Sequence, residues 1–134
     1  MIVVDSNVVA YCWLNSPRTA LAQAVRLQDG DWHVPVLWRS ELRSVLGGYL
    51  RRRDLSVKQA GLVMQRIESE LQGNEHIVDS DEVLKVLSTT DLSAYDCEFV
   101  ALARALGARL VTDDRAILKA LPKDALSMEA FVRS

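Results

Sequence analysis

The stretch Leu92–Lys119 reads LSAYDCEFVALARALGARLVTDDRAILK and holds the clearest structural signals in the chain. Its apolar residues recur at helical spacing over Ala94–Leu106. Gly107 follows, where the left-handed conformation that ends many helices favours glycine. The next run, Ala108–Thr112, is short, apolar and partly β-branched, which is typical of a buried strand. A helix, a tight turn and a strand in this order predict a parallel α/β sheet.

Acids stand at the start of this helix and just after this strand. Ser93 occupies the expected N-cap position, and Asp96 follows three residues later, as in a capping box with Asp in place of Glu. Asp114 follows the strand. A carboxylate in the first turn of a helix stabilises it by about 0.3–1 kcal/mol. Capping alone therefore accounts for Asp96 and Asp114 unless other acids converge on the same place.

Length and composition are those of one globular domain, which we expect to span residues 1–134. Hydrophobic residues make up 49% of the chain and charged residues 25%, so a sizeable core and an ordinary surface are both available. The formal net charge is −2. This balance excludes an overall basic field for nonspecific nucleic-acid binding, so any such binding depends on local charges or metal ions.

The cysteines and histidines predict no zinc site. Cys12 and Cys97 are far apart and lack paired ligand spacing, so we interpret them as buried thiols in a reducing compartment. We interpret His33 and His76 as structural because no second ligand lies near either in sequence. The apolar opening Met1–Val4 is too short for a signal peptide or a membrane span, which predicts a cytoplasmic protein with no membrane association.

The rest of the chain alternates between short apolar runs and amphipathic segments. The expected strands are Met1–Val4, Trp32–Val34, His76–Asp79 and an edge strand at Ala125–Met128. The expected helices are Val8–Leu14 with its cap at Ser6 or Asn7, one from Pro17, a long one from Pro35, one after Ser56, one from Ser80 and a small one around Ile117. This order predicts a three-layer α/β/α sandwich with a mostly parallel sheet of four or five strands.

Four acids converge in this architecture. Asp5 and Asp114 both follow strand ends, and Asp96 opens a helix on the same edge of the sheet. Glu41 lies in the first turns of the long helix, at the margin of its apolar stripe, where an acid is unusual. Ligands of parallel sheets bind beyond the carboxyl ends of the strands. We therefore expect the four carboxylates to face one crevice.

Clustered carboxylates of this kind favour a divalent cation. Like charges at close range raise each other's pKa and destabilise the fold unless a cation lies among them. Oxygen ligands without Cys or His favour Mg²⁺ or Mn²⁺ over zinc. Such an ion lowers the pKa of a bound water and neutralises a phosphodiester. The chemistry this pattern indicates is metal-assisted phosphodiester hydrolysis.

Basic residues lie along the same long helix. Arg39 and Arg43 flank Glu41, and the run Arg51, Arg52 and Arg53 stands where the helix ends. Cations suit a helix C-terminus, so a solvated helix end accounts for the run. Contact with a polyanion such as RNA, or with a protein partner, is the alternative, and both interpretations stay open.

Four segments together resemble the acidic motifs of the PIN-domain nucleases, in order and over almost the whole chain. They are Ile2–Val8 with Asp5, Pro35–Leu46 with Glu41, Tyr95–Ala103 with Asp96, and Leu110–Asp114. Length and spacing are similar to those of VapC-type toxins. The resemblance implies that Asp5, Glu41, Asp96 and Asp114 are the catalytic, metal-binding acids. It also implies hydrogen-bonding support from Asn7 and Thr112, and Ser44 stands where the family often has Asn.

The resemblance further implies an activity and partners. It implies an endoribonuclease selective for single-stranded or loop RNA that uses Mg²⁺ or Mn²⁺. It also implies a homodimer, alone or within a larger toxin–antitoxin complex, and a small antitoxin whose tail blocks the active-site groove.

Other functions remain as alternatives. Aspartyl-phosphate enzymes also use an Asp at a strand end, but their phosphatase motif needs a second Asp where this chain has Asn7. A non-catalytic α/β module would use the acids as caps and its helices as a partner-binding surface. A housekeeping PIN nuclease would share the chemistry but have no antitoxin.

Overall fold

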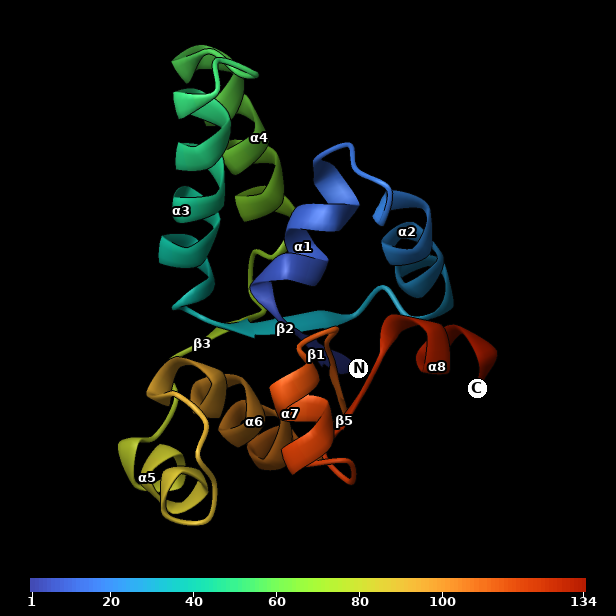
Figure 1. Ribbon diagram of the computed structural model, residues 1–134, viewed down its shortest axis with the longest axis vertical. Helices are drawn as coiled ribbons and strands as arrows, with labels where there is room; N and C mark the ends of the chain where they lie inside the picture. Colours follow the sequence, from blue (N-terminus) through green and yellow to red (C-terminus); the bar gives the residue numbers. More distant parts are fainter.

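A five-stranded parallel sheet forms the centre of the computed structural model, which describes residues 1–134 (Figure 1). The strands are β1 (Ile2–Val4), β2 (Trp32–Pro35), β3 (Glu75–His76), β4 (Leu110–Val111) and β5 (Ala125–Leu126). Their spatial order is β3-β2-β1-β4-β5, and all four pairings are parallel. The predicted mostly parallel sheet is confirmed, with five strands.

Helices cover both faces of this sheet. One layer contains α1 (Ser6–Trp13), α2 (Thr19–Gln28), α3 (Trp38–Arg51) and α4 (Val57–Glu70), and the other contains α5 (Ser80–Ser88), α6 (Ala94–Leu106) and α7 (Arg115–Ala120). The final helix, α8 (Met128–Arg133), packs beside α2. Figure 1 shows the α3–α4 hairpin extending away from the sheet. The predicted α/β/α sandwich is confirmed, and none of its helices combines the length and apolarity needed to span a bilayer.

The central strand β1 connects the two layers because its side chains alternate between the faces of the sheet. Ile2 and Val4 belong to a cluster of 20 buried residues under α1 to α4. Val3 belongs to a separate cluster of 12 buried residues under α5, α6 and α7. All three side chains are almost fully buried, so β1 and its carboxyl end are held from both sides.

Helix α6 forms as its sequence predicts. Ser93 accepts a hydrogen bond from the backbone N–H of Asp96 at 3.1 Å, which caps the first turn. Gly107 ends the helix with φ of 63°, a conformation in which a Cβ would be strained. The helix therefore begins at a defined residue, and this fixes the position of Asp96.

Some predicted boundaries are wrong for local reasons. Pro35 ends β2 rather than starting the long helix, because it pairs with His76 and the next N–H, that of Val36, bonds to the His76 carbonyl. The cap of α1 is Asp5, not Ser6 or Asn7.

Strands β3 and β5 end earlier than predicted. β3 ends at His76, and the following Ile77 is exposed. The edge strand stops at Leu126 because Ser127 caps a helix, α8, that the sequence analysis did not predict.

Candidate active site

The site lies at the topological switch point of the sheet, where the strand order runs to opposite sides of the central strand. From the central β1 the chain moves to β2 on one side, whereas β4 lies on the other. Asp5 directly follows β1, and Asp114 follows β4 after two residues. Ligands of open α/β sheets bind at this kind of switch point, beyond the carboxyl ends of the strands.

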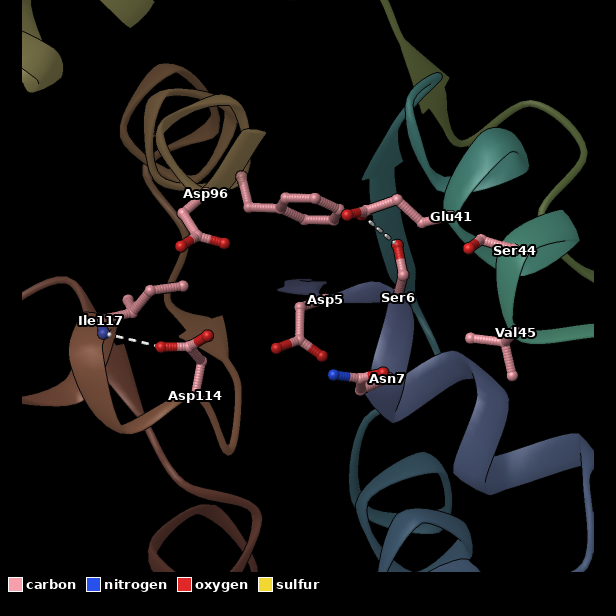
Figure 2. Close-up of a pocket in the computed structure, with 10 residues that line it drawn as sticks. Asp5, Ser6, Asn7, Glu41, Ser44, Val45, Asp96, Asp114 and Ile117 are labelled. Atoms are coloured by element: carbon pink, nitrogen blue, oxygen red, sulfur yellow. Dashed lines mark hydrogen bonds between the residues drawn. The ribbon is translucent and has the colours of Figure 1, made fainter. Parts of the chain in front are cut away.

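A pocket of about 300 Å³ opens at this point, and the four predicted acids all line it (Figure 2). Asp5 comes from the end of β1, Glu41 from the first turn of α3, Asp96 from the first turn of α6, and Asp114 from the cap of α7. The lining residues are Asp5, Ser6, Asn7, Glu41, Ser44, Val45, Asp96, Phe99, Asp114 and Ile117. We call this cavity the acidic pocket.

Asp5 is the most constrained of the four acids. Its side chain is almost fully buried, and its Oδ1 accepts a hydrogen bond from Val8 N at 3.0 Å. Its Oδ2 accepts a hydrogen bond from the hydroxyl of the fully buried Thr112. The same Thr112 oxygen accepts a bond from Asp114 N at 3.0 Å. Thr112 thus connects two of the acids.

Asp114 caps α7 and Asp96 lies in the first turn of α6, and Figure 2 shows both on the side of the pocket opposite Glu41. Asp114 Oδ1 accepts a hydrogen bond from Ile117 N at 3.1 Å, which caps α7. Asp114 is therefore a helix cap, as the capping interpretation predicted, but capping uses only one of its carboxylate oxygens. Its second carboxylate oxygen has no protein donor and is free for another partner.

Glu41 is held by a residue that the sequence analysis did not select. The hydroxyl of Ser6 donates a hydrogen bond to Glu41 Oε1 at 2.7 Å (Figure 2). Ser6 is buried, so this bond is sheltered from water. The available sequence signal was a small hydroxyl residue directly after Asp5, in the first turn of a helix.

Two of the predicted supporting residues only line the pocket. Asn7 and Ser44 are exposed in its wall, and neither side chain hydrogen-bonds to an acid. The side-chain hydrogen bonds to the acids come from Thr112, which was among the predicted supporting residues, and from Ser6, which was not.

No basic side chain neutralises the four carboxylates, since none of them takes part in an ion pair. Burial raises the pKa of Asp5 from its ordinary value of 3.8 to about 6, and the nearby charges of Asp113 and Asp114 act in the same direction. Burial and then the charge of Asp114 also raise the pKa of Asp96. Ionisation of these carboxylates therefore lowers the stability of the folded protein.

A raised pKa is also found for an acid just outside the acidic pocket. Burial and then the charge of Glu41 raise the pKa of Glu98, which lines a neighbouring groove. Glu98 is a fifth acid near the site, and our sequence analysis assigned it no role.

The donor set of the pocket fits a small divalent cation. No group of three or more His, Cys, Asp and Glu side chains is arranged to enclose a metal ion alone. Mg²⁺ does not need such a cage, because it keeps several water ligands and binds proteins through one or two carboxylates. A lining with four carboxylates and no Cys or His matches that preference and disfavours zinc.

The arginines differ in availability. Arg39 donates to Glu75 through Nε and Nη2 and to Glu68 through Nη1, so it is engaged within the fold. Arg52 pairs with Asp54 at 3.1 Å. The remaining predicted contact residues, Arg43, Arg51 and Arg53, form no ion pair.

Distance separates these free arginines into two groups. Arg43 lies two residues from Glu41 and is exposed. Arg51 and Arg53 lie at the far end of α3, about 15 Å along the helix axis from Glu41. Side chains two residues apart on a helix do not share a face, so Arg43 lies outside the lining of the acidic pocket although it is close to Glu41 in sequence. The Arg51–Arg53 run is farther from the pocket still.

The cysteines and histidines lie outside the pocket. Cys12 and Cys97 are buried free thiols, as predicted. His33 Nδ1 and His76 Nε2 are hydrogen-bonded to each other at 2.8 Å across β2 and β3.

Comparison with known proteins identifies related folds. The crystal structure of PAE2754 from Pyrobaculum aerophilum is 21% identical, with a TM-score of 0.76, over 98% of this chain and 86% of that one. FitAcB from Neisseria gonorrhoeae is 20% identical, with a TM-score of 0.75, over 96% and 99%. FitAB bound to an IR36 DNA fragment is 18% identical, with a TM-score of 0.73, over 96% and 95%. At these identities the likeness shows a shared fold.

No curated protein matches the sequence significantly. The family model for the PIN domain, however, matches residues 2–123, a range that includes β1 to β4 and all four acids of the pocket. The chain belongs to the PIN domain family.

Proposed function

We propose that this protein is an endoribonuclease that depends on Mg²⁺ or Mn²⁺ and hydrolyses phosphodiester bonds of single-stranded or loop RNA. One observation carries the proposal: four carboxylates from four separate segments line one pocket, and no cation of the protein pairs with them. A fold that needed the acids only as caps would not bring their charges together at this cost. PIN-domain membership supports the nuclease assignment.

Each acid has a role in this proposal. Asp5, Asp96, Asp114 and Glu41 would hold the divalent ion, one or two of them directly and the others through its water ligands. The ion, when bound, lowers the pKa of a water and offsets the charge of the phosphodiester. Thr112 orients Asp5, and Ser6 orients Glu41, through the hydrogen bonds already described. Arg43, exposed and unpaired on α3, would contact the backbone of RNA that extends beyond the pocket.

We further propose that the nuclease is the toxin of a toxin–antitoxin pair and acts in the cytoplasm as a homodimer. The length of the chain and the order and spacing of the four motifs support this, because they are similar to those of VapC-type toxins. A small antitoxin would then cover the acidic pocket, and the Arg51–Arg53 run is available for the antitoxin or for RNA.

Cleavage of mixed cellular RNA by the purified protein tests the nuclease assignment. The reaction is run with Mg²⁺, with Mn²⁺ and with a chelator, for the wild type and for Asp96→Asn. We expect cutting that needs the metal and is lost in the variant. A folded Asp96→Asn protein with wild-type activity would contradict the assignment, whereas binding of a protein partner without cleavage or metal binding would favour the non-catalytic module.

Expression in a bacterial host tests the toxin assignment separately. We expect wild-type protein to arrest growth and Asp96→Asn to be tolerated. Co-expression of the small gene next to this one should restore growth. Metal-dependent cleavage in vitro without growth arrest and without such a neighbouring gene would favour a housekeeping PIN nuclease.

A further inference from the structure

A second pocket of about 390 Å³ adjoins the acidic pocket and has a different chemistry. Its polar and aromatic lining consists of Tyr11, Arg18, Asp113, Arg115, Ser127 and Glu129. None of these residues lines the acidic pocket. We call this second cavity the Tyr11 pocket.

Two segments connect the pockets. On α1, Asn7 lines the acidic pocket and Tyr11 lines the second, and residues four apart share one face of a helix. After β4, Asp114 lines the acidic pocket, while its neighbours Asp113 and Arg115 line the second. The step from Asn7 to Tyr11 is about 6 Å along the helix axis, which is on the scale of one nucleotide.

The charges of the Tyr11 pocket leave one cation free. Arg18 donates to Glu129 at 2.8 Å and also pairs with Asp113, so these three charges are engaged with one another. Arg115 is exposed and forms neither an ion pair nor a side-chain hydrogen bond. An anionic group that is repelled by the four carboxylates would thus meet a free guanidinium in the neighbouring pocket.

Tyr11 contributes a partly exposed aromatic ring to the same pocket as this guanidinium. The ring packs against the core cluster under α1 to α4, so it is held in place rather than mobile. Burial and then the charges of Asp113 and Asp5 raise the pKa of the Tyr11 phenol. A fixed aromatic face next to a free arginine is the combination that binds single-stranded nucleic acid.

We propose that the Tyr11 pocket binds the nucleotide next to the scissile phosphate of a single-stranded RNA, with its base stacked on Tyr11 and its phosphate bound by Arg115. This inference rests on the proposed nuclease function and adds a substrate-binding subsite to it. Stacking tolerates different bases, so this subsite favours an unpaired nucleotide rather than a particular sequence.

Fluorescence anisotropy with labelled single-stranded dodecauridine tests the subsite. Asp96→Asn protein with Mg²⁺ serves as the parent, so that the probe stays intact. We expect Tyr11→Leu and Arg115→Gln, each added to the parent, to raise the Kd at least about fivefold. Tyr11→Phe should restore binding. Arg115→Gln should also flatten the salt dependence of binding, as loss of one phosphate contact requires.

Lys123→Gln provides the matched control, since Lys123 is also exposed and unpaired but lies in neither pocket. In the wild-type background, Arg115→Gln should raise KM for RNA and leave kcat nearly unchanged. Unchanged Kd and KM in both variants, with wild-type cleavage intact, would overturn the subsite alone. Absence of both binding by the parent and cleavage by the wild type would overturn the proposed function as well.

Discussion

The first turn of helix α3 contains an arginine that is paired with two acids and an acid that has no cationic partner. Arg39 lies between Glu68 and Glu75, with donor–acceptor distances of 2.6–2.9 Å, and forms what we call the Arg39 cluster. Two residues later, Glu41 enters the acidic pocket, where four carboxylates have no cationic partner. Both regions are built from acids on neighbouring elements. The difference is the presence or absence of an arginine.

The pKa values express this difference. Hydrogen bonding to Arg39 lowers the pKa of Glu75, whereas burial raises the pKa of Asp5 to about 6. Ionised Glu75 therefore stabilises the folded state, and ionised Asp5 destabilises it. Acids that serve the fold are neutralised within the protein, and the acids of the pocket keep a charge that only an external cation can neutralise.

The largest expected effect is the loss of activity in Asp96→Asn. We expect RNA cleavage to fall at least about 10³-fold, because several kcal/mol of transition-state stabilisation depend on the bound ions. The thermal midpoint should not decrease, because the variant removes an uncompensated charge. Asp91→Asn, which changes an exposed acid just before α6, is the control and should retain full activity. Equal activity in both variants would remove the distinction between pocket acids and surface acids.

The next effect is a pH-dependent gain in stability in Asp5→Asn. The raised pKa means that stability from protonated Asp5 is fully present below 3.8 and is lost as pH rises through about 6. In chelator at neutral pH, Asp5→Asn should therefore be more stable than wild type by up to about 3 kcal/mol. The two proteins should converge below pH 3.8. Urea unfolding across this range measures the difference.

Asp79→Asn is the matched control for Asp5→Asn. Asp79 also caps a helix, α5, but its side chain is exposed. It should show no gain in stability at neutral pH. A parallel response of the two variants would mean that capping, rather than burial of charge, governs Asp5.

The Arg39 cluster should respond with the opposite sign. Glu75→Gln should reduce the free energy of unfolding at neutral pH by about 2 kcal/mol, because charge-assisted bonds to Arg39 are lost. Since the pKa of Glu75 is lowered, this contribution is present above its ordinary value of 4.5 and is lost as pH falls further. Glu82→Gln, which breaks an exposed ion pair with Lys85, should change stability little. Equal effects would show that the Arg39 cluster behaves as an ordinary surface pair.

The smallest effect concerns how the pocket acids are oriented. Ser6→Ala removes the bond to Glu41 Oε1 and should weaken Mg²⁺ binding about tenfold, measured by calorimetry on the purified protein. Ser6→Thr keeps a hydroxyl and should restore affinity. Ser44→Ala is the control, because Ser44 lines the same pocket without a hydrogen bond to an acid. Equal Mg²⁺ affinities for Ser6→Ala and wild type would remove Ser6 from the site.

Sequence patterns predicted the layers of the fold and the convergence of the four acids. Short apolar runs such as Ile2–Val4 indicated buried strands, and strand ends followed by Asp located the pocket. The pattern did not locate Ser6, because a hydroxyl gains its role only when α3 brings Glu41 within 2.7 Å. It also could not separate Arg39 from the unpaired Arg43, because the partners of Arg39 come from β3 and α4 rather than from adjacent sequence.

Strand β5 has a consequence for when the acidic pocket assembles during synthesis. Thr112, which holds Asp5, donates its own backbone N–H to the carbonyl of Leu126 in β5. Asp5 is thus made well before the strand that supports its partner Thr112. A ribosome adds about 5–20 residues per second, so the nascent chain spends seconds with the acids of the pocket separated. The acidic pocket assembles only after β5 has been synthesised and has paired with β4.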